Sequence, residues 1–111
     1  MRDSCLRCAR KHIAAAEVLM TEAELGYELF AWYAVGHLEQ AESELLSDYP
    51  EEARIVRTER VKYIDGLDYG LDDNDRIILR VNYHIDTLEL LRRITSIEIM
   101  MKATQPDLDQ T

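Results

Sequence analysis

The chain has 111 residues, 47% of them apolar, and its 22 acidic residues outnumber the 13 basic ones to give a net charge of −9. This length suits one globular domain with a single core. The negative charge excludes general binding to nucleic acid or anionic lipid, and no segment reaches the roughly 20 apolar residues of a membrane helix. We therefore expect a soluble, cytoplasmic protein without membrane contact.

The N-terminal part of the chain, residues 4–48, predicts an antiparallel helical hairpin. Asp3 or Ser4 can cap a first helix, which Gly26 would end. The second helix is expected to begin near Tyr27 and to end just before the SDYP segment. Apolar side chains recur every three or four residues along the first helix, at Leu6, Ala9, Ile13, Ala16, Met20 and Ala23. Because the connection is short, the two helices should pack side by side.

A third and a fourth helix are expected in the second half. Pro50 fits the first turn of the third, whose buried side would be Ile55, Val56 and Val61. The DDND segment can cap a fourth helix over residues 72–103, although alternating residues within 77–87 also fit a strand. Continuation into LELLRR without a breaker favours the helix. A helix of that length would expose an apolar strip and favour dimerisation.

These elements predict an all-α fold in which the N-terminal hairpin, the third helix and the long C-terminal helix form a small bundle. Residues 1–103 would make the single domain, and residues 104–111 a flexible tail.

The segment CLRCARKH holds the two cysteines of the chain and one of its three histidines. On a helix, Cys5, Cys8 and His12 project from one narrow sector because they are three and four residues apart. His37 lies on the inward face of the second helix. Two thiolates and two imidazoles form a Cys2His2 set, which suits tetrahedral zinc.

The fourth zinc ligand stays open at this point. Pairing the helices symmetrically about Gly26 places His37 opposite Ala16, about 6 Å along the axis from His12. A bent hairpin would close that gap, and Glu42, Glu44 or water are the other candidates. The alternative without metal is that both cysteines and His37 are buried core residues.

The C-x2-C-x3-H motif resembles the active-site motif of alkylhydroperoxidase-like proteins of the carboxymuconolactone decarboxylase superfamily. The resemblance implies thiol chemistry, with Cys8 as the peroxidatic thiol, Cys5 as the resolving thiol and His12 in the proton relay. It covers eight residues, and the acidic residue that the family has upstream of the first cysteine has no counterpart here.

A second resemblance covers the first half of the chain. The same motif followed by GYELF and AVGHLEQAESEL is similar to a pattern in small uncharacterised proteins of phages and prophages. It implies that Cys5, Cys8, His12, His37 and Glu42 form one linked unit, and that a phage-encoded chain would act in the host cytoplasm or the virion.

Two functional classes follow from these observations. The first, which we favour, is a zinc-stabilised helical module that binds a partner protein or a second copy of itself and is not an enzyme. The second is a thiol oxidoreductase that uses Cys5, Cys8 and His12. Two other features have simpler interpretations. His84 fits a solvated or capped position, and the aromatic cluster of Tyr27, Phe30, Trp32 and Tyr33 fits the core, although an exposed share of it would make an interface.

Overall fold

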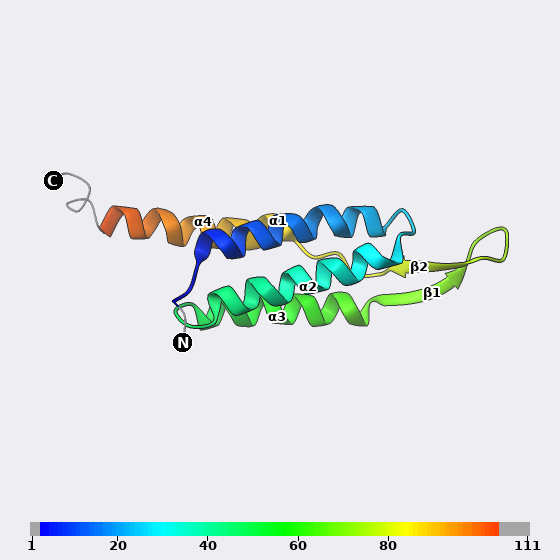
Figure 1. Cartoon of the computed structure of the whole chain (residues 1–111), viewed down its shortest axis with the longest axis horizontal. Helices are drawn as coiled ribbons and strands as arrows, with labels where there is room; N and C mark the ends of the chain where they lie inside the picture. The colour runs from blue at the N-terminus through cyan, green and yellow to red at the C-terminus, as the bar shows by residue number, and fades with distance from the viewer. Residues whose placement is uncertain (1–2, 105–111) are drawn as a thin grey trace.

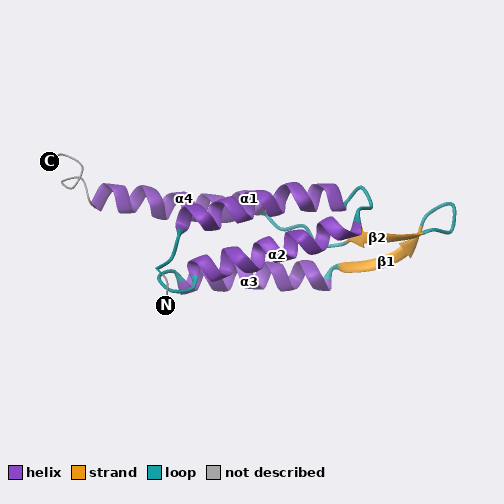
Figure 2. Cartoon of the chain, in the orientation of Figure 1, coloured by secondary structure: helices purple, strands orange, loops and turns teal. Residues whose placement is uncertain are grey.

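A computed structural model of the chain describes residues 3–104, and it is mainly helical with one small antiparallel sheet (Figure 2). The elements in chain order are α1 (Leu6–Ala23), α2 (Glu28–Leu45), α3 (Pro50–Asp65), β1 (Leu67–Leu71), β2 (Ile77–Val81) and α4 (Thr87–Thr104). The mainly helical prediction is confirmed, but a strictly all-α fold is wrong. The part of the expected tail at 105–111 lies outside the described residues.

The four helices form an elongated bundle, and the two strands form a ribbon that projects from one end of it (Figure 1). Helix α1 packs against both α2 and α4, and α2 packs against α3. The molecule measures 66 × 23 × 19 Å. Its shape places the start of α1 and the ribbon at opposite ends of the bundle.

Small side chains line the contact between α1 and α2, where the helical hairpin is confirmed. The buried residues of the two helices include Ala9, Ala16, Ala23, Ala31, Ala34 and Ala41 beside the larger Ile13 and Leu38. Because the distance between packed helices depends on the side chains at the contact, alanines on both faces allow a close approach. This contact brings the polar residues at its edges within reach of each other.

Helix α1 is capped by Cys5 and not by Asp3 or Ser4. The backbone N–H of Cys8 donates to Cys5 Sγ over 3.1 Å. The hydroxyl of Ser4 accepts instead from the backbone N–H of Asp48, and the Asp48 carboxylate accepts from the Ser4 N–H, both over 2.9 Å. Ser4 therefore joins the start of α1 to the turn after α2, which leaves the capping position to the next residue.

The prediction of one long helix after residue 72 is wrong, because the DDND segment forms a turn between two strands. Asp72 Oδ1 accepts from the backbone N–H groups of Asn74 and Arg76, and Asp75 has a left-handed φ of 60°. Such aspartate-centred turns compete with helix formation. The strands pair from Leu67 with Val81 to Leu71 with Ile77, so the alternating pattern in this region did indicate a strand.

Helix α4 is correspondingly shorter than predicted. Asp86 Oδ1 accepts from the backbone N–H of Glu89, as an N-cap does, and the helix runs for 18 residues. Leu90 and Ile94 are buried, whereas Leu88 is 58% exposed. Because this length is ordinary for the bundle, the argument for dimerisation from an unusually long helix no longer holds.

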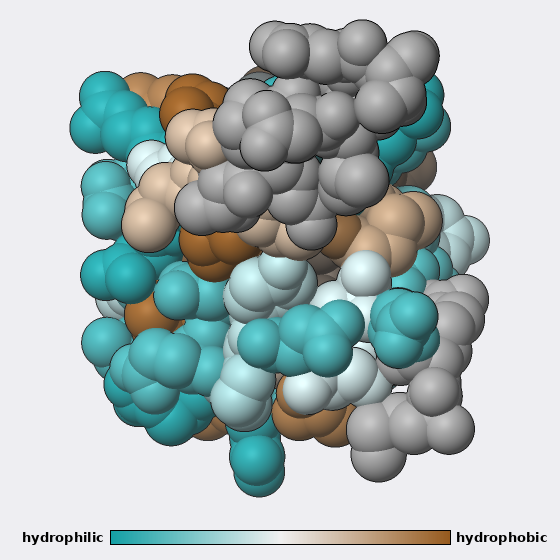
Figure 3. Space-filling model, turned by 90° about the vertical axis from the view of Figure 1, so that its left-hand side faces the viewer, coloured by the Kyte–Doolittle hydropathy of each residue, from teal (hydrophilic) through white to brown (hydrophobic). Residues whose placement is uncertain are grey.

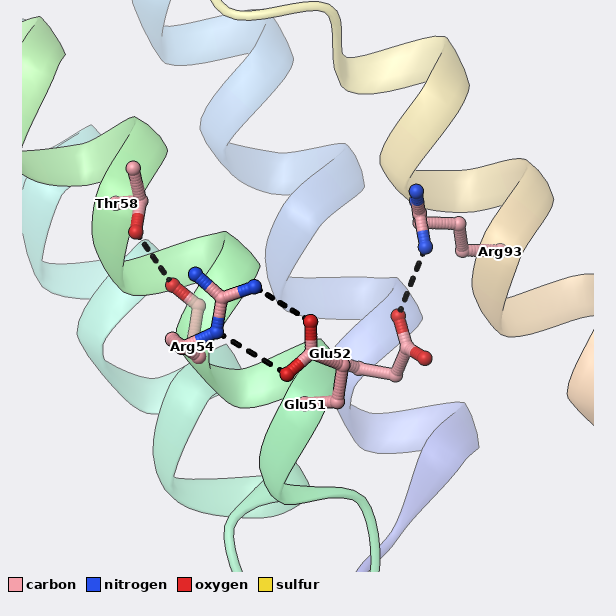
Figure 4. A network of polar contacts seen from close by, with 5 residues as sticks. All are labelled: Glu51, Glu52, Arg54, Thr58 and Arg93. Atoms are coloured by element: carbon pink, nitrogen blue, oxygen red, sulfur yellow. Dashed lines mark hydrogen bonds and ion pairs between the residues drawn. The ribbon is translucent and has the colours of Figure 1, made fainter.

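Polar contacts connect the start of α3 to α4 (Figure 4). Glu51 accepts from the guanidinium of Arg54 within α3, while Glu52 points across to Arg93 of α4 at 3.6 Å. The hydrogen bond from Arg54 is the main cause that lowers the pKa of the Glu51 carboxyl. The ion pair to Arg93 therefore links α3 to α4, whose main packing contact is with α1.

Candidate functional site

Cys5 and Cys8 form a disulfide at the N-terminus of α1. Their Cα atoms are 5.2 Å apart, and both residues are half-buried. The alternative that these cysteines are fully buried core residues therefore does not describe them. Cys5 is held against α2, because its backbone N–H donates to the carbonyl oxygen of Glu44 over 3.0 Å.

His12 and His37 face each other across the contact between α1 and α2. Their Nδ1 atoms are 2.9 Å apart, and their ring centroids are 5.2 Å apart. The symmetrical pairing of His37 with Ala16 was wrong by one turn of α1. The pairing that brings Cys5 to Glu44 also brings His12 to His37, so one register accounts for both contacts.

The contact between the imidazoles constrains their protons. A hydrogen bond between two Nδ1 atoms needs one protonated nitrogen that donates and one unprotonated nitrogen that accepts. Both rings are half-buried, so exchange with solvent and access of a small ion are both open. The two rings can therefore hydrogen-bond to each other, or, as two neutral rings with the proton on Nε2, they can offer two Nδ1 nitrogens to a cation.

The sequence placed Glu42 and Glu44 beside the site as alternative ligands. Glu42 is directed toward α3, where its carboxylate accepts from Arg60 over 2.7 Å. Glu44 is 9% exposed and lines a small hollow with His12, Gln40 and Ser43. Glu44 is therefore the carboxylate placed beside His12, whereas Glu42 is engaged in an ion pair between helices.

Within residues 3–104, no group of three or more His, Cys, Asp or Glu side chains is arranged to hold a metal ion. In this state the two sulfurs are bonded to each other and do not offer thiolates. The structure brings the four predicted ligands together as two pairs, Cys5 with Cys8 and His12 with His37.

The aromatic residues at the start of α2 differ from the prediction of a core cluster. Tyr27, Trp32 and Tyr33 are 57%, 43% and 55% exposed, and only Phe30 packs partly against the core. Trp32 and Tyr33 line a hollow of about 280 Å³ together with Gly36, His37 and Gln40. The sequence indicates this exposure, because Trp32 and Tyr33 lie outside the helical stripe formed by the buried residues Ala31, Ala34 and Leu38.

A third hollow, which the sequence did not indicate, lies between the end of α1 and the segment that joins β2 to α4. It measures about 170 Å³, and Tyr63 forms part of its wall together with Glu24 and His84. His84 is 69% exposed and pairs with Glu24, so its interpretation as a solvated residue is confirmed. Tyr63 is 1% exposed, and burial raises the pKa of its hydroxyl to about 12.

Comparisons of the chain with protein-family models, with curated proteins and with solved structures found no match. In the part of the chain that the structure describes, no helix has both the length and the apolar character needed to cross a bilayer. The features with the clearest chemical character in the described residues are the cysteine pair and the histidine pair.

Proposed function

We propose that this chain is a small helical interaction module whose α1–α2 hairpin is clamped by zinc in its reduced form. The ligands are Cys5, Cys8, His12 and His37. The observation that carries the proposal is the approach of His12 and His37, whose Nδ1 atoms lie 2.9 Å apart although the residues come from different helices.

The histidine geometry is close to what zinc requires. At Zn–N distances of about 2.0–2.1 Å, two nitrogens on one tetrahedral zinc lie about 3.3 Å apart. The His12 and His37 nitrogens need to separate by only a few tenths of an ångström from 2.9 Å to reach this geometry. Binding of a cation by the two Nδ1 atoms therefore requires a small side-chain adjustment, with the proton of each neutral ring on Nε2.

The cysteine geometry is compatible with the same ion once the disulfide is reduced. At a Zn–S distance of about 2.3 Å, two thiolates on one zinc lie about 3.8 Å apart. Cys5 and Cys8 have Cα atoms 5.2 Å apart, so rotation of the side chains can provide that separation. Cys8 and His12 are four residues apart on α1, where Cβ atoms are about 5–6 Å apart.

A zinc ion held by four protein ligands has no open position for substrate, so the proposed role is structural and the function is binding. Exposed apolar residues surround the turn between α1 and α2: Leu25, Tyr27, Leu29, Trp32 and Tyr33. The carboxylates of Glu24 and Glu28 border them, and the whole chain carries a charge of −9. This chemistry suits a partner protein that presents apolar and basic side chains.

The zinc clamp predicts a loss of both metal and stability when Cys8 is replaced. Metal bound only by the folded state adds its binding free energy to folding, so Cys8→Ser should abolish stoichiometric zinc and lower the melting temperature of the reduced chain. His84→Gln is the matched control, because His84 is exposed and far along the chain from the site. Metal analysis and thermal unfolding measure both effects. Unchanged zinc content in Cys8→Ser would contradict the proposal.

The partner face is tested separately from the metal. Sedimentation velocity of the zinc-loaded chain at micromolar concentration should show a monomer, because the excess negative charge opposes self-association. A stable dimer would assign the exposed aromatic face to a second copy of the chain in place of a different protein.

The disulfide favours a second candidate, a thiol oxidoreductase. Cys5 Sγ lies at the N-terminus of α1, where the backbone N–H groups and the helix dipole stabilise a thiolate. This position favours Cys5 as the reactive thiolate, whereas the resemblance to alkylhydroperoxidase-like proteins assigns that role to Cys8. In such a cycle, one thiolate attacks a peroxide oxygen, the O–O bond breaks, and the other oxygen leaves as an alcohol or water after taking up a proton, so that the sulfur becomes a sulfenic acid. The second thiol then forms the disulfide bond to that sulfur and expels the sulfenic oxygen as water.

Peroxide consumption by the reduced, metal-free chain tests the second candidate. An oxidoreductase should consume one equivalent of peroxide for each disulfide and turn over repeatedly when a dithiol reductant is supplied. Oxidation no faster than that of a free thiol would eliminate this candidate and leave the zinc module.

A further inference from the structure

The two sulfurs that the proposed zinc site needs are the same two sulfurs that the structure shows as a disulfide. A cysteine binds zinc only as a thiolate, so the four-ligand zinc state and the disulfide state exclude each other. We propose that oxidation of Cys5 and Cys8 by a small disulfide compound releases zinc while the hairpin stays folded. This inference rests on the zinc site proposed above and concerns its regulation.

The balanced exchange uses a low-molecular-weight disulfide such as oxidised glutathione. One protein thiolate attacks a sulfur of the small disulfide, which forms a mixed disulfide and expels one small thiolate. The second protein thiolate attacks the protein sulfur of the mixed disulfide and expels the other small thiolate. The protein loses two electrons, the small disulfide gains them, and Zn²⁺ leaves because both thiolate ligands are gone. A dithiol reverses the reaction.

The structure of the oxidised hairpin explains why it need not unfold. At its open end, Cys5 N–H donates to Glu44, Ser4 and Asp48 bond reciprocally, and His12 contacts His37. None of these contacts needs a metal. The buried alanines, Ile13 and Leu38 hold the rest of α1 against α2. Loss of zinc therefore changes the site and its surroundings rather than the fold.

Trp32 reports on the exchange without any label. It is the only tryptophan of the chain, and it lines one hollow together with His37. In the disulfide state the His37 ring contacts His12, whereas in the zinc state it would be fixed to the metal. Because the environment of Trp32 includes this ring, its fluorescence should differ between the two states.

The experiment follows zinc-loaded, reduced full-length chain after addition of oxidised glutathione. A chromophoric chelator measures free zinc, and mass spectrometry under denaturing conditions measures the intramolecular disulfide. We expect one zinc released per disulfide formed, a parallel change in Trp32 fluorescence and a far-UV circular dichroism spectrum that remains helical. A dithiol with added zinc should restore the starting state.

Two variants define the controls. His84→Gln should release zinc like the unchanged chain. Cys5→Ser keeps a side-chain oxygen that can cap α1, so it should remain helical, but it can form no Cys5–Cys8 disulfide. Oxidised glutathione should therefore produce neither the intramolecular disulfide nor the Trp32 change in Cys5→Ser.

The outcomes separate the two proposals. If the reduced chain binds no zinc, both the zinc module and its oxidative release are wrong. If it binds zinc but the oxidant leaves the metal in place, or releases it without forming the disulfide, only the release mechanism is wrong. Loss of the helical signal on oxidation would overturn the claim that the disulfide state is the folded alternative.

Discussion

Tyr63 has a buried hydroxyl that makes no hydrogen bond to any residue the structure describes. A buried polar group without a partner costs about 1–3 kcal/mol, and Tyr63→Phe removes that group while keeping the ring. We expect the free energy of unfolding to rise by about 1 kcal/mol, as measured by urea denaturation. Tyr69→Phe is the control, because Tyr69 is 53% exposed and donates to Glu28. A loss of stability in Tyr63→Phe would mean that the hydroxyl has a partner.

Because the Tyr63 hydroxyl has a raised pKa, we expect the free energy of unfolding to fall at high pH. Burial, with the charge of Glu24 as a smaller cause, raises the pKa of Tyr63 to about 12, whereas a tyrosine in the unfolded chain ionises near its model value of 10.0. Between these values the unfolded state has lost a proton that the folded state keeps, so rising pH favours unfolding by at most about 1.4 kcal/mol per pH unit. The loss should begin near pH 10 and be smaller in Tyr63→Phe. Equal losses in both chains would contradict it.

At the candidate site, the sequence predicted contacts within one helix better than contacts between two helices. The shared sector of Cys5, Cys8 and His12 follows from helical spacing alone. The partner of His37 depends on how two helices pack, and the close contact of their alanines sets a register one turn away from symmetrical pairing. Whether Cys5 and Cys8 are thiolates or a disulfide depends on redox conditions that spacing does not contain.

Among the elements, the existence of helices α1 to α3 was predictable from their punctuation and apolar spacing. The buried side of α3 was predicted only in part, because Val56 is buried as expected but Val61 is 45% exposed and Tyr63 is buried instead. Pro50 lies in the first turn of α3, and Gly66 follows its last residue. The ribbon was missed because its strand pattern ran without a break into α4, and because Asp72 stabilises a turn through contacts that resemble helix capping. Local propensity alone does not separate those two uses of aspartate.

Replacing Gly66 or Gly70, which lie in or next to the ribbon, by alanine should lower the stability by different amounts. A Cβ at Gly66 would lie 2.9 Å from the backbone nitrogen of Tyr83, whereas the three atoms nearest to a Cβ at Gly70 all belong to the guanidinium of Arg80. A flexible side chain can move away and backbone cannot, so Gly66→Ala should cost about 1–3 kcal/mol and Gly70→Ala less than about 1 kcal/mol. Chemical denaturation measures both.

The control for these two variants is Gly36→Ala. Gly36 lies inside α2 with no atom within 4 Å of a new Cβ, so the substitution should stabilise by about 0.5–1 kcal/mol. If Gly70→Ala proved as costly as Gly66→Ala, the position of Arg80 over the ribbon would be fixed rather than adjustable.

For the molecule as a whole, the net charge of −9 means that repulsion between carboxylates outweighs the attraction within ion pairs. Raising the salt concentration from about 0.01 M to about 1 M shortens the screening length from about 30 Å to about 3 Å. Partly buried pairs such as Arg60 with Glu42 are screened less than the repulsion between exposed carboxylates. Salt should therefore raise the melting temperature of the metal-free chain. A fall would show that exposed ion pairs dominate.

Exposed apolar residues occur at more than one place on the molecule. On the end of the bundle where α1 begins, hydrophobic residues gather in a band across the upper half of the view, and hydrophilic residues cover most of the lower half (Figure 3). The exposed residues near the end of α4 include Ile99 and Met100, at 61% and 66%. For the proposed interaction module, we propose the start of α2 as the partner face because exposed aromatic side chains and carboxylates occur together there.

The ribbon between α3 and α4 has a consequence for the order of folding. It carries the chain beyond the bundle before α4 returns to α1, so contacts such as Arg10 with Glu98 join residues 88 positions apart. Helices α1, α2 and α3 connect through short turns and can associate before α4 is available. Docking of α4 should thus be the last step of folding and its release the first step of opening. In native-state hydrogen exchange, the amides of α4 should exchange before those in the centres of α1 and α2.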